Sequence, residues 1–122
     1  MRAEVRSIHS PDAPDALDRW RPSSPRDFEL LLEAEIGPAG GEGSEVFTLR
    51  AVGPDWLAAH DGDKGFRWGR GLLVLQEWDF AVAERAISDL CRRTEGEAWA
   101  DVAIKLARFM HWEFEDYRPA PV

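Results

Sequence analysis

Apolar and polar residues alternate most clearly over residues 28–36, which is the pattern of a half-buried β-strand. Residues 2–9 alternate in the same way, and residues 45–53 are rich in the β-branched and aromatic types that strands favour. The Gly-rich stretch over residues 37–43 joins two of these segments, which indicates an antiparallel hairpin. Residues 72–78 form the most apolar segment, so we expect a central strand there.

Two later segments repeat their apolar residues every three or four positions, as amphipathic helices do. The first runs over residues 80–93 with Asp79 as its N-cap, and the second over residues 97–110 after Gly96. A short helix is expected over residues 54–59, because that segment opens with Pro and Asp. The pattern predicts an α+β fold, a two-layer sandwich in which two main helices pack on one face of an antiparallel sheet of about four strands.

Two segments outside these elements also have an expected place. Residues 10–25 contain four prolines around Trp20, which should pin this loop to the core. After the helices, residues 112–117 alternate again. Trp112 and Phe114 are therefore expected to dock on the sheet and to leave the carboxylates between them outward.

Length and charge narrow the possible functions. A chain of 122 residues has room for one core, so residues 1–122 are expected to form a single domain with a flexible tail over 118–122. The net charge of −8 disfavours nucleic acid and anionic membranes as ligands, because both would repel it, and permits a basic protein partner. Acidity also serves solubility alone. The sequence shows neither a long apolar run nor a signal-peptide pattern, which predicts a cytoplasmic protein.

The sequence offers no recognisable pattern for catalysis or metal binding. Its single cysteine, Cys91, lies among apolar residues of a predicted helix and is expected to be a small core residue. His9, His60 and His111 fall in three different elements, without metal-ligand spacing. We therefore expect no enzymatic activity, no intrinsic metal and no cofactor.

Carboxylates and exposed aromatic residues are the candidates for binding a partner. The carboxylates share one strand face or cluster near the C-terminus, and the aromatic residues lie in a polar, Gly-rich loop over residues 60–70. The predicted partner-binding residues are Glu29, Glu33, Glu35, Phe66, Trp68, Glu113, Glu115 and Asp116. A simpler interpretation of the strand carboxylates is cross-strand pairing with Arg2, Arg6 and Arg50.

Five segments, taken together and in order, resemble a known family. They are Ala3-Glu-Val-Arg-Ser-Ile-His-Ser-Pro11, Ile36-Gly-Pro-Ala-Gly-Gly-Glu-Gly-Ser-Glu-Val-Phe47, Gly53-Pro-Asp-Trp-Leu57, Gly96-Glu-Ala-Trp99 and Trp112-Glu-Phe-Glu-Asp-Tyr117. Their order and spacing are similar to those of the immunity protein 8 family of bacterial polymorphic toxin systems. The resemblance implies a non-enzymatic protein that binds and neutralises a cognate toxin domain. An acidic chain then fits a basic, nuclease-like toxin as the partner.

Two other classes of function stay open from the residues alone. A small-molecule-binding or enzymatic α+β domain would place Glu113 and Glu115 in one carboxylate-lined pocket. A structural subunit would use Phe66 and Trp68 for self-association. A carboxylate-lined pocket requires the side chains of Glu113 and Glu115 to converge, so the fold tests that alternative directly.

Overall fold

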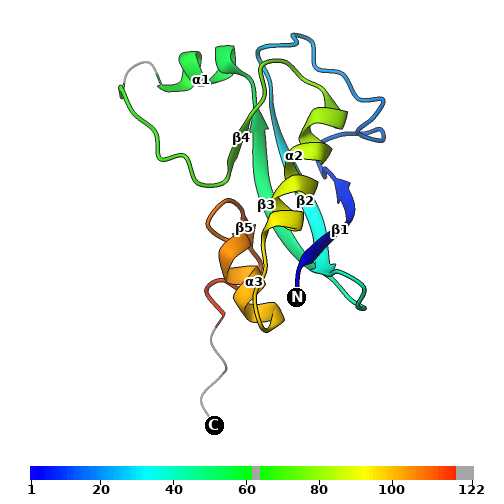
Figure 1. The fold of residues 1–122 in the computed structure, drawn as a ribbon. Helices are drawn as coiled ribbons and strands as arrows, with labels where there is room; N and C mark the ends of the chain where they lie inside the picture. Colours follow the sequence, from blue (N-terminus) through cyan, green and yellow to red (C-terminus); the bar gives the residue numbers. More distant parts are fainter. Residues whose placement is uncertain (62–63, 118–122) are drawn as a thin grey trace.

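The computed structural model describes residues 1–61 and 64–117, and the expected tail over residues 118–122 lies outside the described residues. The elements in chain order are β1 (Ala3–His9), β2 (Glu29–Pro38), β3 (Glu45–Val52), α1 (Pro54–Asp61), β4 (Leu72–Val74), α2 (Phe80–Arg93), α3 (Trp99–Leu106) and β5 (His111–Trp112). The strands form one sheet in the order β1-β2-β3-β4, and β5 also pairs with β3. The predicted α+β class is confirmed (Figure 1).

β1, β2 and β3 form an antiparallel meander, as the alternation and the Gly-rich hairpin predict. Every second residue from 30 to 36 is buried, and the residues between them are half-buried. The register of β1 shifts at a bulge between Val5 and Ser7. The extra residue allows Ile8 to face the same side of the sheet as Val5, because a bulge changes the phase of the side-chain alternation.

The segment predicted as a central strand is an edge strand, so that part of the prediction is wrong. β4 covers only Leu72–Val74 and runs parallel to β3, which makes the sheet mixed rather than purely antiparallel. A parallel neighbour needs a crossover connection, and α1 with the loop after it supplies one. β4 is apolar because Leu73 borders an apolar hollow beside α2, while Leu72 also borders a cleft on the other side of the sheet.

α2 and α3 lie on the same side of the sheet and cover its inner face (Figure 1). Asp79 caps α2 as predicted, because its Oδ1 accepts a hydrogen bond from Ala81 N at 3.0 Å. Cys91 lies on the buried face of α2. α3 ends at Leu106 rather than at residue 110, because residues 107–110 turn back toward β5.

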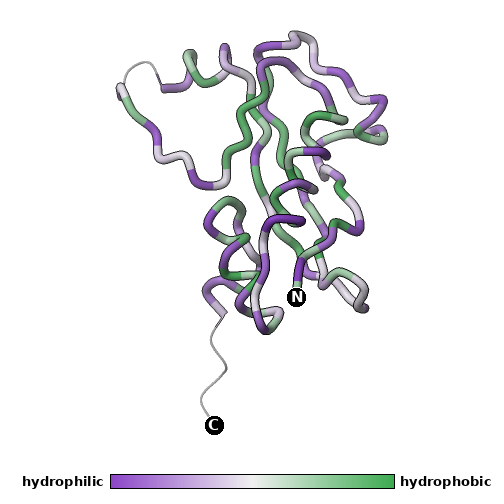
Figure 2. The backbone as a smooth tube through the Cα atoms, in the orientation of Figure 1, coloured by the Kyte–Doolittle hydropathy of each residue, from purple (hydrophilic) through white to green (hydrophobic). Residues whose placement is uncertain are grey.

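The core lies between these helices and the inner face of the sheet. Its largest fully buried side chains include Phe47, Leu32, Ile36 and Leu106, which come from two strands and a helix. Figure 2 shows the hydrophobic positions running along β3 and β4, whereas the connecting loops are mostly hydrophilic. No helix of the described residues lies over the opposite, outer face of the sheet (Figure 1), which is the face on which polar strand residues are displayed.

Trp20 pins the Pro-rich loop, as predicted. Its ring meets the ring of Trp78 edge-on, with 4.9 Å between centroids, and Trp78 Nε1 donates to the carbonyl oxygen of Trp20 at 3.1 Å. Phe28 packs edge-on against the same indole at 5.6 Å. The loop therefore closes one end of the core through aromatic contacts.

The C-terminal stretch is extended only over His111–Trp112, and a turn follows. Trp112 pairs with Phe47 across the sheet and its ring stacks on that phenyl ring, with 6.4 Å between centroids, so its predicted docking is confirmed. Phe114 is 40% exposed, so the prediction that it also docks on the sheet is wrong. The turn carries it to the edge of the Trp112 ring, 6.0 Å away.

Candidate functional site

The outer face of the sheet displays the acidic row, which consists of Glu29, Glu33 and Glu35 of β2. Each of these half-buried carboxylates has a polar neighbour. Glu35 Oε2 accepts a hydrogen bond from Ser7 Oγ at 2.8 Å, and Glu33 Oε2 lies 3.5 Å from His9 Nε2. Glu29 forms an ion pair with an arginine of β3. The acidic row is therefore a surface feature that its neighbours partly neutralise.

Cross-strand pairing explains one of the three arginines predicted to neutralise this row. Arg50 pairs with Glu29, as expected. Arg2 instead lies 3.6 Å from the carboxylate of Glu95, and Arg6 pairs with Glu4. These two expectations are wrong for different reasons. Arg2 precedes Ala3, which lies opposite Pro38 at the end of β2 and so beyond the acidic row, whereas Arg6 occupies the bulge and donates from Nη2 to the carbonyl oxygens of Pro38 and Gly41.

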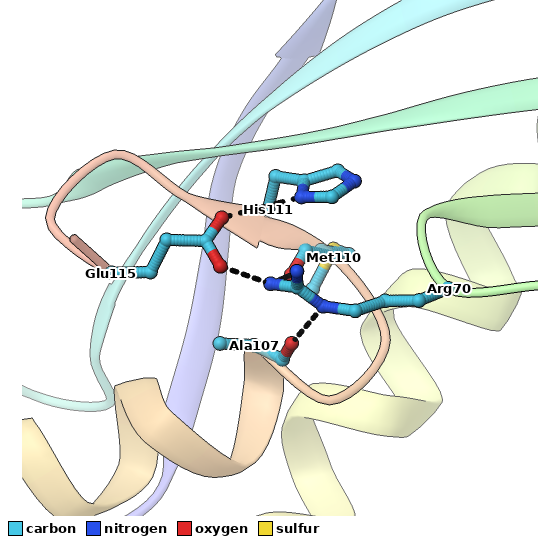
Figure 3. Close-up of polar contacts among 5 residues, drawn as sticks. All are labelled: Arg70, Ala107, Met110, His111 and Glu115. Atoms are coloured by element: carbon cyan, nitrogen blue, oxygen red, sulfur yellow. Dashed lines mark hydrogen bonds and ion pairs between the residues drawn. The ribbon is translucent and has the colours of Figure 1, made fainter.

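The C-terminal carboxylates do not form one outward patch, because their segment is a turn and not a strand. Asp116 is exposed, and Glu113 Oε1 accepts a hydrogen bond from a backbone N–H of β3 at 3.2 Å. Glu115 pairs with Arg70 and lies 3.2 Å from His111 Nδ1 (Figure 3). Glu115 is exposed but bound to other side chains, and Glu113 and Glu115 face different partners and do not converge.

The loop after α1 presents the two predicted aromatic side chains. Phe66 is 63% exposed and Trp68 is 87% exposed. Arg67, between them, is fixed to α1, since its Nε donates to both carboxylate oxygens of Asp61 at 2.8 and 3.0 Å. Its guanidinium carbon also lies 5.1 Å from the ring centroid of Trp56, close enough for a cation–π contact. Phe66 and Trp68 thus lie on either side of an arginine that is held against α1.

Arg70, two residues after Trp68, is also held in place by hydrogen bonds. Arg70 donates from Nε to the carbonyl oxygen of Ala107 at 2.7 Å and from Nη2 to that of Met110 at 3.2 Å (Figure 3). We call residues 64–71 the Trp68 loop. Arginine contacts on both sides of Trp68 hold this loop in place, although Trp68 itself packs on almost nothing.

The ion pair with Arg70 also helps to lower the pKa of Glu115. Partial burial raises the pKa of this carboxyl, but hydrogen bonds and attraction from Arg70 and His111 outweigh that effect, so its pKa lies below the ordinary value of 4.5. Glu115 is therefore ionised at neutral pH, in the form that binds Arg70.

The Trp68 loop and the outer face of the sheet border a cleft of about 330 Å³. Its lining includes Leu31 and Thr48 of the sheet. Cationic and aromatic residues complete it, namely Arg50, Arg67, Trp68, Arg70 and His111. Gly71 has a φ of +79°, and a Cβ there would lie 2.6 Å from His111 Nε2, so glycine is required for this close approach.

The cleft joins residues that the sequence placed in separate elements. Trp68 lines it directly, Glu29 reaches it through Arg50, and Glu115 reaches it through Arg70. The predicted residues that neither line it nor pair with an arginine that does are Glu33, Glu35, Phe66, Glu113 and Asp116. Sequence reasoning missed the cationic cluster, although the string Arg67-Trp68-Gly69-Arg70 carries a local signal of it.

The possible metal ligands and the single cysteine can be placed in the described residues. Over residues 1–61 and 64–117, no group of three His, Cys, Asp or Glu side chains is placed to hold a metal ion. Cys91 is buried as expected, and burial raises the pKa of its thiol to about 12, so it is not a thiolate nucleophile at neutral pH. In the same described part of the chain, no helix is long and apolar enough to cross a membrane.

One comparison with known proteins gives a match. The family model described as immunity protein 8 matches residues 3–117. Neither the curated proteins nor the solved structures contain a match. The matched range includes the acidic row, the Trp68 loop and the whole cleft.

Proposed function

The chain belongs to the immunity protein 8 family, and from this premise we propose that it binds and blocks the cognate toxin domain of a bacterial polymorphic toxin system. In this proposal it acts in the cytoplasm of the producing cell and by binding alone. The observation that carries the choice of surface is Trp68, which is 87% exposed on a loop held on both sides by arginine contacts.

A large aromatic side chain that is exposed yet held in place fits a protein-binding anchor. Tryptophan and arginine dominate the energetics of protein interfaces, because each offers a large contact area with polar groups attached. A loop that is already ordered also loses less conformational entropy on binding than a flexible one. Phe66, two residues before Trp68, is 63% exposed and is a second aromatic candidate on the same loop.

The acidic residues support a basic partner. The chain carries a net charge of −8, and the acidic row lies on the same sheet face as the cleft. A nuclease-like toxin is basic around its substrate, since phosphate contacts dominate nucleic-acid binding. In the proposal the acidic row, with Glu113 and Asp116 at its margin, attracts such a toxin and raises the association rate.

The carboxylate-lined pocket of the alternative function has no support in the fold. Glu113 faces a backbone N–H of β3, whereas Glu115 faces Arg70 and His111. Self-association through Phe66 and Trp68 remains an alternative use of the same aromatic surface. It is tested by measuring the molar mass of the purified protein over a range of concentrations.

The direct test is co-expression with the toxin domain encoded beside the gene. We expect the protein to restore growth of cells that express this toxin and to co-elute with it in size-exclusion chromatography. A catalytically inactive toxin variant keeps the binding measurement separate from toxicity. Growth arrest despite abundant, folded protein, together with separate elution of the two proteins, would refute the proposed function.

A further inference from the structure

Among the described residues, the charged side chains that line the cleft are all arginines, whereas the protein as a whole is acidic. Arg50, Arg67, Arg70 and His111 line it, and no aspartate or glutamate of residues 1–61 or 64–117 does. The chain has 23 acidic and only 15 basic residues, yet three arginines meet around this one cleft, each paired with a carboxylate beside it. Attraction of a basic toxin by net charge alone gives no reason for such a cluster.

Two of these arginines have hydrogen-bond donors to spare. Arg67 uses only Nε for Asp61, and the structure records no partner for its two terminal nitrogens among the described residues. Arg50 uses Nη1 for Glu29, and no partner is recorded there for its Nη2. A guanidinium has five N–H donors in a planar fork that matches a carboxylate. The two side chains keep 52% and 33% of their surface exposed, for Arg50 and Arg67 respectively.

We propose that the cleft receives a carboxylate side chain, an aspartate or glutamate, from the surface of the toxin. This inference rests on the proposed function and adds the chemistry of one contact to it. The carboxylate binds the free donors of Arg50 and Arg67, and the exposed ring of Trp68 covers the apolar part of the entering side chain. Charge-assisted hydrogen bonds of this kind are stronger than neutral ones.

A protein carboxylate fits the cleft better than a nucleic-acid phosphate. Glu29, Asp61 and Glu115 each bind one of the cleft arginines, and the protein as a whole is acidic. A polyanion would be repelled by these surroundings, whereas a single carboxylate on a basic protein would reach the cleft. The toxin surface would then carry basic groups opposite the acidic row and an acidic group opposite the cleft, a pattern that fixes the orientation of the complex.

The test compares Arg50→Gln with the matched variant Arg85→Gln. Arg85 is exposed on α2, on the helix-covered side of the sheet and away from the cleft. Each variant replaces one arginine with glutamine, so both lose one positive charge. The Kd for the inactive toxin domain encoded beside the gene is measured by isothermal titration calorimetry at physiological salt. We expect Arg50→Gln to weaken binding about 10- to 100-fold. Arg85→Gln should leave binding unchanged or slightly tighter, because it makes the protein more acidic.

The outcomes separate this inference from the proposed function. If the wild-type protein binds the toxin and Arg50→Gln binds equally well or more tightly, the carboxylate contact is wrong while the immunity function stands. If the wild-type protein does not bind the toxin, the proposed function fails and the inference fails with it. Binding of a single-stranded oligonucleotide that depends on Arg50 would assign the cleft to phosphate and overturn the proposal. Arg50→Lys, which keeps the charge but not the fork, should bind with intermediate affinity.

Discussion

Replacing Trp68 with alanine should impair binding and leave folding almost unchanged. Because 87% of its surface is exposed, the side chain contributes little buried area to the fold, and the free energy of unfolding should change by less than about 0.5 kcal/mol. Complete burial of a tryptophan in an interface covers roughly 150–250 Å². At about 25 cal/mol per Å² that area corresponds to about 4–6 kcal/mol.

The costs of ordering and incomplete burial reduce this upper bound to the range of a strong interface anchor, about 2–4 kcal/mol. The Kd for the inactive toxin should therefore rise about 30- to 1,000-fold. Calorimetric titration measures the Kd, and thermal denaturation checks the fold.

Phe109→Ala is the control, because Phe109 is also largely exposed, at 55%, but borders the hollow beside α2. Its variant should bind like the wild type. A Trp68→Ala protein that binds within about threefold of the wild type would refute the reasoning, and so would an equal loss for both variants.

Three further predictions follow from the geometry. Trp112→Ala should lower the unfolding free energy by about 2–4 kcal/mol, because the indole ring packs on Phe47. Trp112→Phe should lower it much less, since the buried Nε1 of Trp112 has no recorded hydrogen-bond partner in the described residues. Urea denaturation compares the two variants. Burial raises the pKa of Cys91 from 9.0 to about 12, so the contribution of the neutral thiol to stability is complete below about pH 9 and is lost between pH 9 and 12. Cys91→Ala should remove this part of the dependence of the unfolding free energy on pH. Rapid chemical modification of the thiol in the folded protein would contradict its burial. The lowered pKa of Glu115 contributes stability above pH 4.5 that disappears as the pH falls through its folded value, and Glu115→Gln should flatten the profile in that acid range.

Local periodicity was sufficient to predict the strands and helices that bury one face and expose the other. The alternation in β2 and the apolar stripe of α2 are both confirmed, because each element buries one face and exposes the other. β4 shows the limit of this reasoning. Its apolar residues indicated a central strand, yet a short edge strand is equally apolar when one side meets α2 and the other borders a cleft.

The candidate site depends on contacts that no sequence pattern contains. Trp68 was predicted from composition, because an aromatic residue in a polar, Gly-rich loop has little reason to be buried. Arg50 and His111 were not connected to it, since they reach the cleft only through the pairing of β3 with β4 and β5. The ion pair of Glu115 was missed for the same reason, because its partner Arg70 lies 45 residues earlier in the chain.

The two arginines that hold the Trp68 loop differ in when they can act during synthesis. Arg67 binds Asp61, six residues before it, so this contact can form as soon as the local segment has left the ribosome. The carbonyl groups that receive Arg70 are made 37 and 40 residues after it. A nascent chain that stops before residue 107 therefore carries Trp68 on a loop fixed at one side only. Both contacts can therefore hold the Trp68 loop only after residues 107–110 have been made, and shorter chains carry the same tryptophan on a less constrained loop.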